Sequence, residues 1–346
     1  MYQYPVEQCD VSDKERLRQF REKRAEWITW LRGDDPHSIW RQITALLWDD
    51  VLFRTVNDLR REAVERPSEG VGFNGAVLRL FDAGFVTTQV TAIRRLTDRQ
   101  PRDPTKGVIS LRRLIADIRD HRHLMTRELY VSYDGLPYEP EPVQAAWIEK
   151  RAAAGSLNGM SWLQTTGPTA WATSQMVHDN FDKLSKRGPD GRSRSDLIAP
   201  EWFDWLDSRL DVCNDIRKYT DKFVAHAAEP SSREGLTETQ TGVTLDRLRL
   251  YQRAIYEVAA FLYGPLLWEG SYGAVPTPQY DHLENLEKGW IAKNASEVAH
   301  GHWNRNLEAI EKWESECLWP HANESDGQSP HALDAQQKTR TSEPEH

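Results

Sequence analysis

The sequence predicts an all-α protein, and three observations support this fold class. Apolar residues recur at spacings of three and four residues along most of the 346-residue chain. Residues that commonly begin or end helices, such as Ser12, Gly33 and Pro36, stand where these patterns start or stop. Strand-like patterns are confined to scattered short segments such as 129–133, and no internal repeat of fixed period is present. We therefore expect a fold built of helices.

The first third of the chain predicts three long helices. Ser12 is the expected N-cap of the first, with Glu15 three residues later completing a capping box, and Gly33 is a natural stop. Asp35 opens a second helix, whose apolar stripe is wide enough to face a core and which ends in a loop rich in glycine and proline. The third helix is expected over residues 74–98, before a loop rich in proline and charge.

The rest of the chain predicts shorter helices separated by irregular segments. Residues 126–142 are expected to be irregular, and 186–195 are expected to form an exposed loop. Helices are expected over these ranges: 110–124, 142–154, 169–186, 200–225, 244–263, 280–292 and 297–318.

These elements suggest four regions. We expect an N-terminal helix in residues 1–33, the main helical bundle in 34–268, further helices in 269–320 and a disordered tail in 321–346. The last 25 residues hold five acids, two bases and almost no large apolar side chain, which is typical of disorder.

Composition excludes several classes of protein. A net charge of -9 argues against a protein that coats DNA through a broad basic surface. The most apolar stretch, 258–268, is broken by Gly264 and Pro265 and is too short to span a membrane, and no signal peptide is visible at the start. Three widely separated cysteines fit a reducing compartment. These features predict a cytoplasmic protein without membrane contact.

Motifs for cofactors and metals are weak. The glycines at 70, 72 and 75 have dinucleotide-site spacing, but no buried strand precedes them, so we interpret them as an inter-helix loop. The His pairs 121/123 and 300/302 lack further ligands, and i, i+2 positions diverge on a helix. We therefore expect no cofactor and no metal.

Two stretches are rich in basic residues and could contact phosphates, although a solvated face is the simpler interpretation. Between residues 90 and 125, nine arginines and lysines face only four aspartates, and residues 183–194 hold five basic side chains against one aspartate. The candidate RNA-binding residues from the first stretch are Arg94, Arg95, Arg112, Arg113 and Arg119.

The segment 215–226 carries the candidate catalytic chemistry. His226 ends the expected helix, where an imidazole can act as an acid or base near neutral pH. Arg217 and Asp221 are spaced i, i+4 and could pair, while Ile216, Phe223 and Val224 would face the core. The simpler alternative is a capping histidine beside a surface ion pair.

Two blocks of sequence resemble a known family. Residues 216–227, IRKYTDKFVAHA, resemble the Arg-Asp-Lys-x-x-Ala-His signature of HEPN domains, in the branch related to the abortive-infection protein AbiU2. Residues 92–98 and 109–115, AIRRLTD and ISLRRLI, resemble the helices that precede it in that branch. The resemblance covers roughly residues 36–265. It implies an antiparallel helical bundle, often a homodimer, and active members are metal-independent endoribonucleases that use an Arg and a His spaced four to six residues apart.

The sequence departs from that catalytic pattern. For His226 the arginine would stand at residues 219–221, and none of these is Arg; the usual position is Thr220. Arg217 is nine residues away, about 13 Å along a helix. Lys222 could replace the missing cation, so the candidate catalytic residues are His226, Lys222, Arg217 and Asp221.

Three hypotheses follow. The first is a HEPN-like protein related to abortive-infection and defence proteins, binding RNA or a protein partner. The second is a metal-independent endoribonuclease in which His226 does acid/base work. The third is a non-catalytic helical interaction module.

Overall fold

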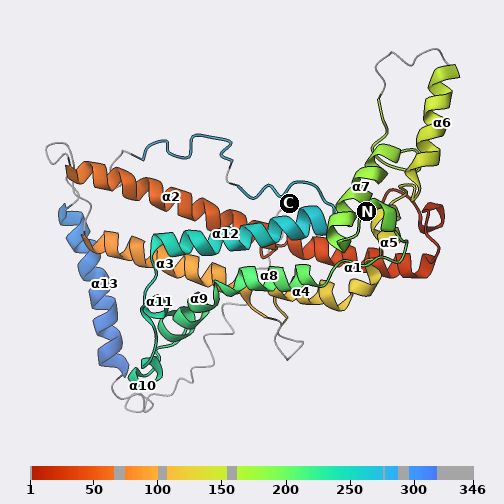
Figure 1. Ribbon diagram of the computed structural model, residues 1–346. Coiled ribbons are helices and arrows are strands. Elements are labelled where there is room, and N and C mark those ends of the chain that lie inside the picture. Colours follow the sequence, from red (N-terminus) through yellow and green to blue (C-terminus); the bar gives the residue numbers. More distant parts are fainter. Residues whose placement is uncertain are drawn as a thin grey trace, which may run out of the picture. The chain divides into compact units, whose positions relative to one another are not determined.

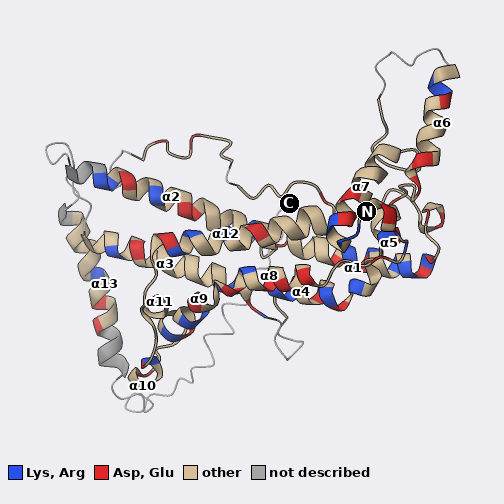
Figure 2. Ribbon diagram, viewed as in Figure 1, with Lys and Arg blue, Asp and Glu red and all other residues tan. Residues whose placement is uncertain are grey.

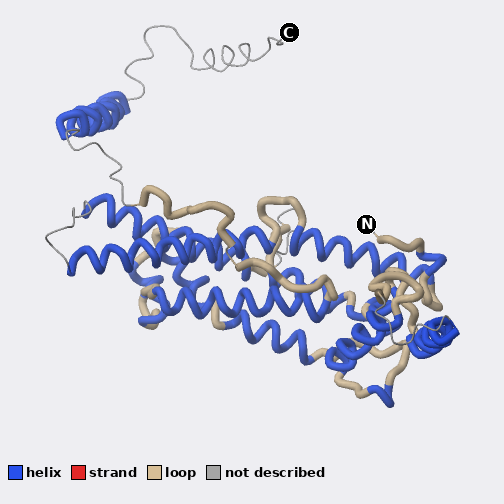
Figure 3. Tube along the Cα trace, turned by 90° about the horizontal axis from the view of Figure 1, so that it is seen from above, coloured by secondary structure: helices blue, strands red, loops and turns tan. Residues whose placement is uncertain are grey.

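The computed structural model describes residues 2–65, 75–99, 107–153, 162–275, 277–286 and 296–317. Within these ranges the chain is helical and contains no strand, only a single bridging pair between Thr126 and Leu197 (Figures 1 and 3). The predicted all-α fold class is confirmed. The chain separates into two compact units, Met1–Thr277 and Pro278–His346, and the predicted disordered tail lies outside the described residues.

Long helices form the centre of the first unit. They are α1 (Lys14–Arg32), α2 (Ile39–Glu65), α3 (Gly75–Thr97), α4 (Leu111–Asp120), α8 (Glu201–Asp211) and α12 (Leu245–Phe261). Helix α2 runs antiparallel to α3, and α12 packs against both (Figure 1). Helix α8 packs against α4 and α12, so the helices of the N-terminal region and of the expected bundle share one core.

Buried amides fix how α2, α3 and α12 align. The Gln89 side chain donates to the carbonyl of Leu46 at 3.0 Å, and Gln252 donates to the Gln89 side chain at 2.9 Å. Both glutamines are buried, where an unpaired amide costs free energy. The pairing therefore favours one register of α2, α3 and α12 over sliding alternatives.

Shorter helices gather around α7 at one end of this unit (Figure 1). They are α5 (Arg127–Ser132), α6 (Pro140–Ala153) and α7 (Trp171–Ser185). Arg127 is fully buried and pairs with Asp182 at 2.7 Å and Asp196 at 3.0 Å. The predicted exposed loop after α7, with a 3-10 turn at Pro189–Gly191, is joined to this network because Arg192 also pairs with Asp182.

Two local predictions are wrong for identifiable reasons. The strand-like segment 129–133 belongs to α5, because Thr126 caps that helix by accepting from the backbone of Leu129. Asp13, not Ser12, caps α1 by accepting from the backbone of Arg16 at 2.9 Å. The Ser12 hydroxyl instead donates to Glu128 at 2.8 Å.

The helices after α8 are broken into short pieces. They are α9 (Asn214–Tyr219), a π-helix at Thr220–Val224, α10 (Pro230–Arg233) and α11 (Glu238–Thr241), and a second π-helix, Leu262–Leu266, extends α12. In the second unit, α13 (Ser296–Cys317) matches the helix predicted there. The helix predicted over 280–292 is a run of turns up to residue 286, and the remainder lies outside the described residues.

One described helix, α3, is long and apolar enough to cross a membrane by length and composition. The sequence pattern had pointed to 258–268 as the most apolar stretch. Val90, Ile93 and Leu96 in its C-terminal half are buried against neighbouring helices, whereas Val77, Leu80 and Phe81 in its N-terminal half are exposed.

Candidate nucleic-acid interface

The segment that carries the candidate catalytic residues is not the single helix that the sequence predicts over 200–225. Helix α8 ends at Asp211, and the backbone of Cys213 donates to the carbonyl of Leu210, which forms a tight turn before α9 begins. Helix α9 then passes into the π-helix, in which the backbone of Ala225 donates to the carbonyl of Thr220 at 2.8 Å. The change of axis after α8 brings this segment against α3.

The two sequence blocks of the resemblance meet in space. Arg94 on α3 contacts the carboxylate of Asp221 in the π-helix through Nε at 2.9 Å and Nη2 at 2.8 Å. Arg94 also binds Asp98 through Nη1 at 3.2 Å. Arg217 approaches the other oxygen of Asp221 at 3.9 Å. These four side chains form what we call the junction cluster, although 127 residues separate Arg94 from Asp221.

The charges of the junction cluster sum to about zero, but the carboxyl group of Asp98 has a shifted pKa. Burial raises the pKa of Asp98 above its ordinary value, and the nearby Asp221 carboxylate acts in the same direction. Arg94 and Arg217 oppose both effects. Two arginines facing two aspartates leave the cluster near neutral, so its first consequence is to fix the π-helix on α3.

At residue 220, where the resemblance would place an arginine, the chain has a threonine with a structural role. Thr220 is buried, and its hydroxyl donates to the carbonyl of Ile216 at 2.8 Å. The nearest cations to Asp221 therefore come from one turn earlier, at Arg217, and from another helix, at Arg94. The sequence predicted the pair of Arg217 with Asp221, but the closer pair with Arg94 was not foreseen.

His226 lies just beyond the end of the π-helix and is exposed. Its imidazole makes no hydrogen bond or ion pair with any described residue. The histidine is thus in the open environment that proton transfer to a large substrate requires, and it is not sealed against the core as a structural cap would be.

Exposed cations and aromatic rings precede and follow His226 in the sequence. Arg217 and Lys218 are exposed on α9, where Figure 2 shows basic residues gathered, and Arg233 is exposed on α10. Tyr219 and Phe223 stack with ring centroids 5.3 Å apart. Phe223, which the sequence pattern assigned to the core, is 37% exposed, whereas Ile216 is buried as predicted.

Other contacts join α10 to this surface. The guanidinium of Arg233 lies 5.9 Å from the centre of the Phe223 ring, and the Lys222 ammonium donates to the hydroxyl of Ser232. We call residues 217–233 the α9–α10 surface. Its side chains offer positive charge, an aromatic platform and one exposed imidazole.

The arginines of α4 are engaged with α8 rather than turned outward together. Arg112 is buried and binds Asp211 at 2.9 Å and Asp207 at 3.5 Å. Arg119 binds Asp207 at 2.6 Å. Arg113 lies over the ring of Trp30 at 4.1 Å and donates to the carbonyl of Val108. The candidate RNA-binding residues of α4 thus hold helices together.

Arg95 faces a different part of the molecule from Arg94. It is exposed and lines a small cavity between α2 and α3 together with His37 and Asp49. The five candidate RNA-binding arginines therefore do not form one surface.

A signal for the true partners of the α4 arginines was present in the sequence. Asp204, Asp207 and Asp211 are spaced i, i+3 and i+7, which places them on one face of a helix. The three aspartates form an acidic helix face, and such a face can pair with a basic helix. The sequence therefore contains enough information to predict that the α8 aspartates neutralise the arginines of α4.

Comparison of the chain with protein-family models, with curated proteins and with solved structures finds no match. In the part of the chain that the structure describes, no group of three or more His, Cys, Asp or Glu side chains is placed to hold a metal ion. The side chains of the α9–α10 surface can thus bind anions through arginine and lysine, stack flat groups on aromatic rings and transfer protons through His226.

Proposed function

We propose that the chain is a HEPN-like protein, related to abortive-infection and defence proteins, that binds single-stranded RNA on the α9–α10 surface. The observation that carries the proposal is the presence of exposed cations and stacked, partly exposed aromatic rings in the same chain segment as His226, a segment held against α3 by Arg94 and Asp221. The two sequence blocks that suggested the family are the two that meet there.

Physical chemistry favours RNA as the ligand of such a surface. Lysine and arginine neutralise phosphates and release counterions, and aromatic rings stack on unpaired bases without regard to sequence. An exposed phenylalanine costs free energy in water, and a base stacked on Phe223 removes that cost. A local cationic segment on an acidic protein also restricts binding to one place.

Binding is tested with labelled single-stranded RNA by fluorescence anisotropy over a series of salt concentrations. The double variant Lys218→Gln/Arg233→Gln is compared with Arg79→Gln/Lys150→Gln, which removes two exposed charges from α3 and α6. We expect the first variant to bind more weakly with a salt slope smaller by about one to two, and the second to bind as the wild type does. Equal affinities and slopes for all three proteins would contradict the proposal.

A second candidate function is metal-independent RNA cleavage, and the exposed, unengaged imidazole of His226 favours it. RNA carries its own nucleophile in the 2′-hydroxyl, so a histidine that accepts its proton and a cation that stabilises the phosphorane are sufficient. The candidate cations are Lys222, four residues before His226, and Arg217, nine residues before it.

Cleavage is tested on a mixed pool of labelled RNAs in EDTA. Wild type is compared with His226→Ala. The control variant is His123→Ala, which removes a different exposed histidine. Cleavage abolished only by His226→Ala supports the nuclease. Cleavage that persists in His226→Ala excludes this role, and RNA binding without cleavage leaves the first proposal intact. Absence of both, with a protein that co-purifies, would favour the interaction module.

A further inference from the structure

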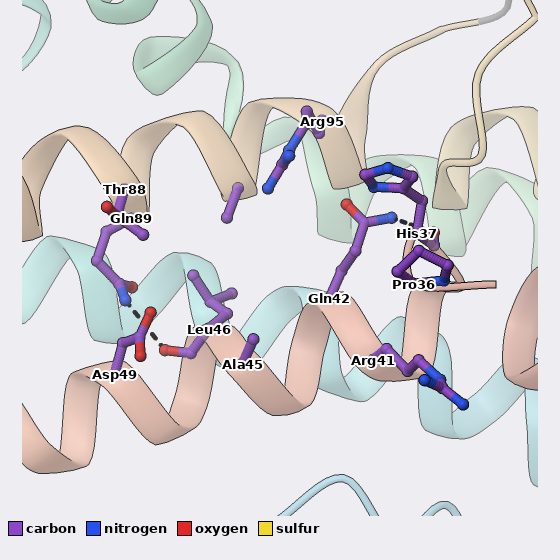
Figure 4. A pocket seen from close by; sticks show the side chains of 11 residues that line it. Pro36, His37, Arg41, Gln42, Ala45, Leu46, Asp49, Thr88, Gln89 and Arg95 are labelled. Atoms are coloured by element: carbon purple, nitrogen blue, oxygen red, sulfur yellow. Dashed lines mark hydrogen bonds between the residues drawn. The ribbon is translucent and has the colours of Figure 1, made fainter. Parts of the chain in front are cut away.

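A cavity of about 210 Å³ lies between α2 and α3, and none of the junction cluster side chains lines it (Figure 4). Its lining comes from the start of α2 and the end of α3. Arg95 and His37 stand at one end, Asp49 and Thr88 stand at the other, and Ala45, Leu46 and Ala92 form the apolar part between them.

The two ends of this cavity have opposite charge. Arg95 makes no ion pair with any described residue, and Arg41 at the same end is only loosely paired with Asp34 at 3.5 Å. At the other end, Asp49 has neither a hydrogen-bond nor an ion-pair partner among the described residues. Burial raises the pKa of Asp49 above its ordinary value.

The helices set the distance between these ends. Gln42 and Asp49 are seven residues apart on α2, as are Thr88 and Arg95 on α3. Seven residues of α-helix rise by about 10.5 Å. A ligand that satisfies both ends is therefore about 10 Å long, which exceeds the separation of charges in a free amino acid.

A third polar group is placed between the ends. Gln42 is 7% exposed, and its Nε2 donates to the carbonyl of His37. This bond fixes the amide, so Oε1 is directed toward the cavity, where it has no hydrogen-bond partner (Figure 4). A buried acceptor without a donor destabilises the folded chain. Oε1 of Gln42 is thus an acceptor near the cationic end that a donor group of a ligand would satisfy.

We propose that this cavity binds a nucleoside monophosphate whose base carries an exocyclic amino group. The phosphate lies between Arg95 and His37, with Arg41 at the rim. A ribose hydroxyl donates to Oε1 of Gln42, the base covers Leu46 and Ala92, and the amino group donates to Asp49. Along such a ligand the phosphate, the ribose hydroxyl, the flat base and the amino group follow one another. The cavity residues that would bind these groups follow in the same order.

The test is calorimetric titration of the full chain with AMP, CMP, GMP and UMP, with adenosine and inorganic phosphate as fragments. We expect AMP, CMP or GMP to bind at least about tenfold more tightly than UMP, because UMP has no exocyclic amine for Asp49. Each fragment should bind more weakly than the intact nucleotide.

Two variants and one control assign the site. Arg95→Gln should weaken the preferred nucleotide at least about tenfold, and Asp49→Asn should reduce the preference over UMP. Arg79→Gln removes an equivalent exposed charge from α3 sixteen residues earlier and should change neither. Absence of binding at millimolar nucleotide, or binding that Arg95→Gln leaves unchanged, would overturn the proposal. Neither outcome affects RNA binding at the α9–α10 surface, so the two proposals fail separately.

Discussion

The contact between Arg94 and Asp221 gives the sharpest prediction for stability. Arg94→Gln, Asp221→Asn and their combination form a double-mutant cycle that isolates the coupling of α3 to the π-helix. One hydrogen bond of 2.9 Å from Nε of Arg94 and an ion-pair contact of 2.8 Å from its Nη2 join the charged groups; a charged hydrogen bond that is fully buried would contribute about 1.5–3 kcal/mol. The side chains are 28% and 36% exposed, so solvent screening reduces the expected coupling to about 1 kcal/mol.

Urea unfolding of the four proteins measures this coupling free energy directly. The cycle cancels the separate contact of Arg94 with Asp98, which both Arg94-containing proteins retain. Arg217→Gln is the control, since its charge lies 3.9 Å from Asp221 and is half exposed, and we expect it to change stability by less than about 0.3 kcal/mol. If the coupling free energy of Arg94 and Asp221 is no larger than the stability change of Arg217→Gln, the contact between Arg94 and Asp221 does not hold the π-helix on α3.

Three further predictions concern the scaffold. Leu114→Ala on α4 should lower the free energy of unfolding by about 2–5 kcal/mol, measured by urea denaturation, because the side chain is fully buried; a loss below about 1 kcal/mol would contradict the packing. Asp13→Ala should cost about 1 kcal/mol in the same assay through loss of the α1 cap, and an unchanged midpoint would reassign the cap. Burial lowers the pKa of His178, so the native state prefers the neutral ring; its contribution is present above the unfolded pKa of about 6.5 and is lost as pH falls from that value through the lower folded pKa. Wild type should therefore lose more stability than His178→Gln between pH 7.5 and 5.5, and parallel curves would exclude this linkage.

The fold class and the long helices were predictable because they depend on local periodicity. The pattern of α2, α3 and α12 extends over many turns, and the helix α13 was placed to within one residue at each end. The cap of α1 was misplaced by one residue because Ser12 and Asp13 are both good caps. A long-range bond from Ser12 to Glu128 decided between them.

The candidate site was less predictable because its contacts join distant segments. The residues 215–226 were identified correctly as the polar end of a helix, but nothing local shows that Asp221 binds Arg94 across 127 residues. Similarly, Arg112 and Arg113 are adjacent in the sequence, yet one is buried against aspartates of α8 and the other lies over Trp30. A run of arginines in a sequence gives the amount of positive charge in that segment. It does not identify the acidic side chains that pair with these arginines in the fold.

The π-helix at Thr220–Val224 has a consequence for the separation of Arg217 and His226. A single π turn holds one residue more than an α turn, and such a turn arises when a helix accommodates an inserted residue without unwinding its flanks. The chain leaves the helix directly after this turn, at Ala225, so His226 does not lie on the helical frame that carries Arg217. The turn that ends the helix, and not the rise per residue of an α-helix, therefore sets the separation of these two side chains.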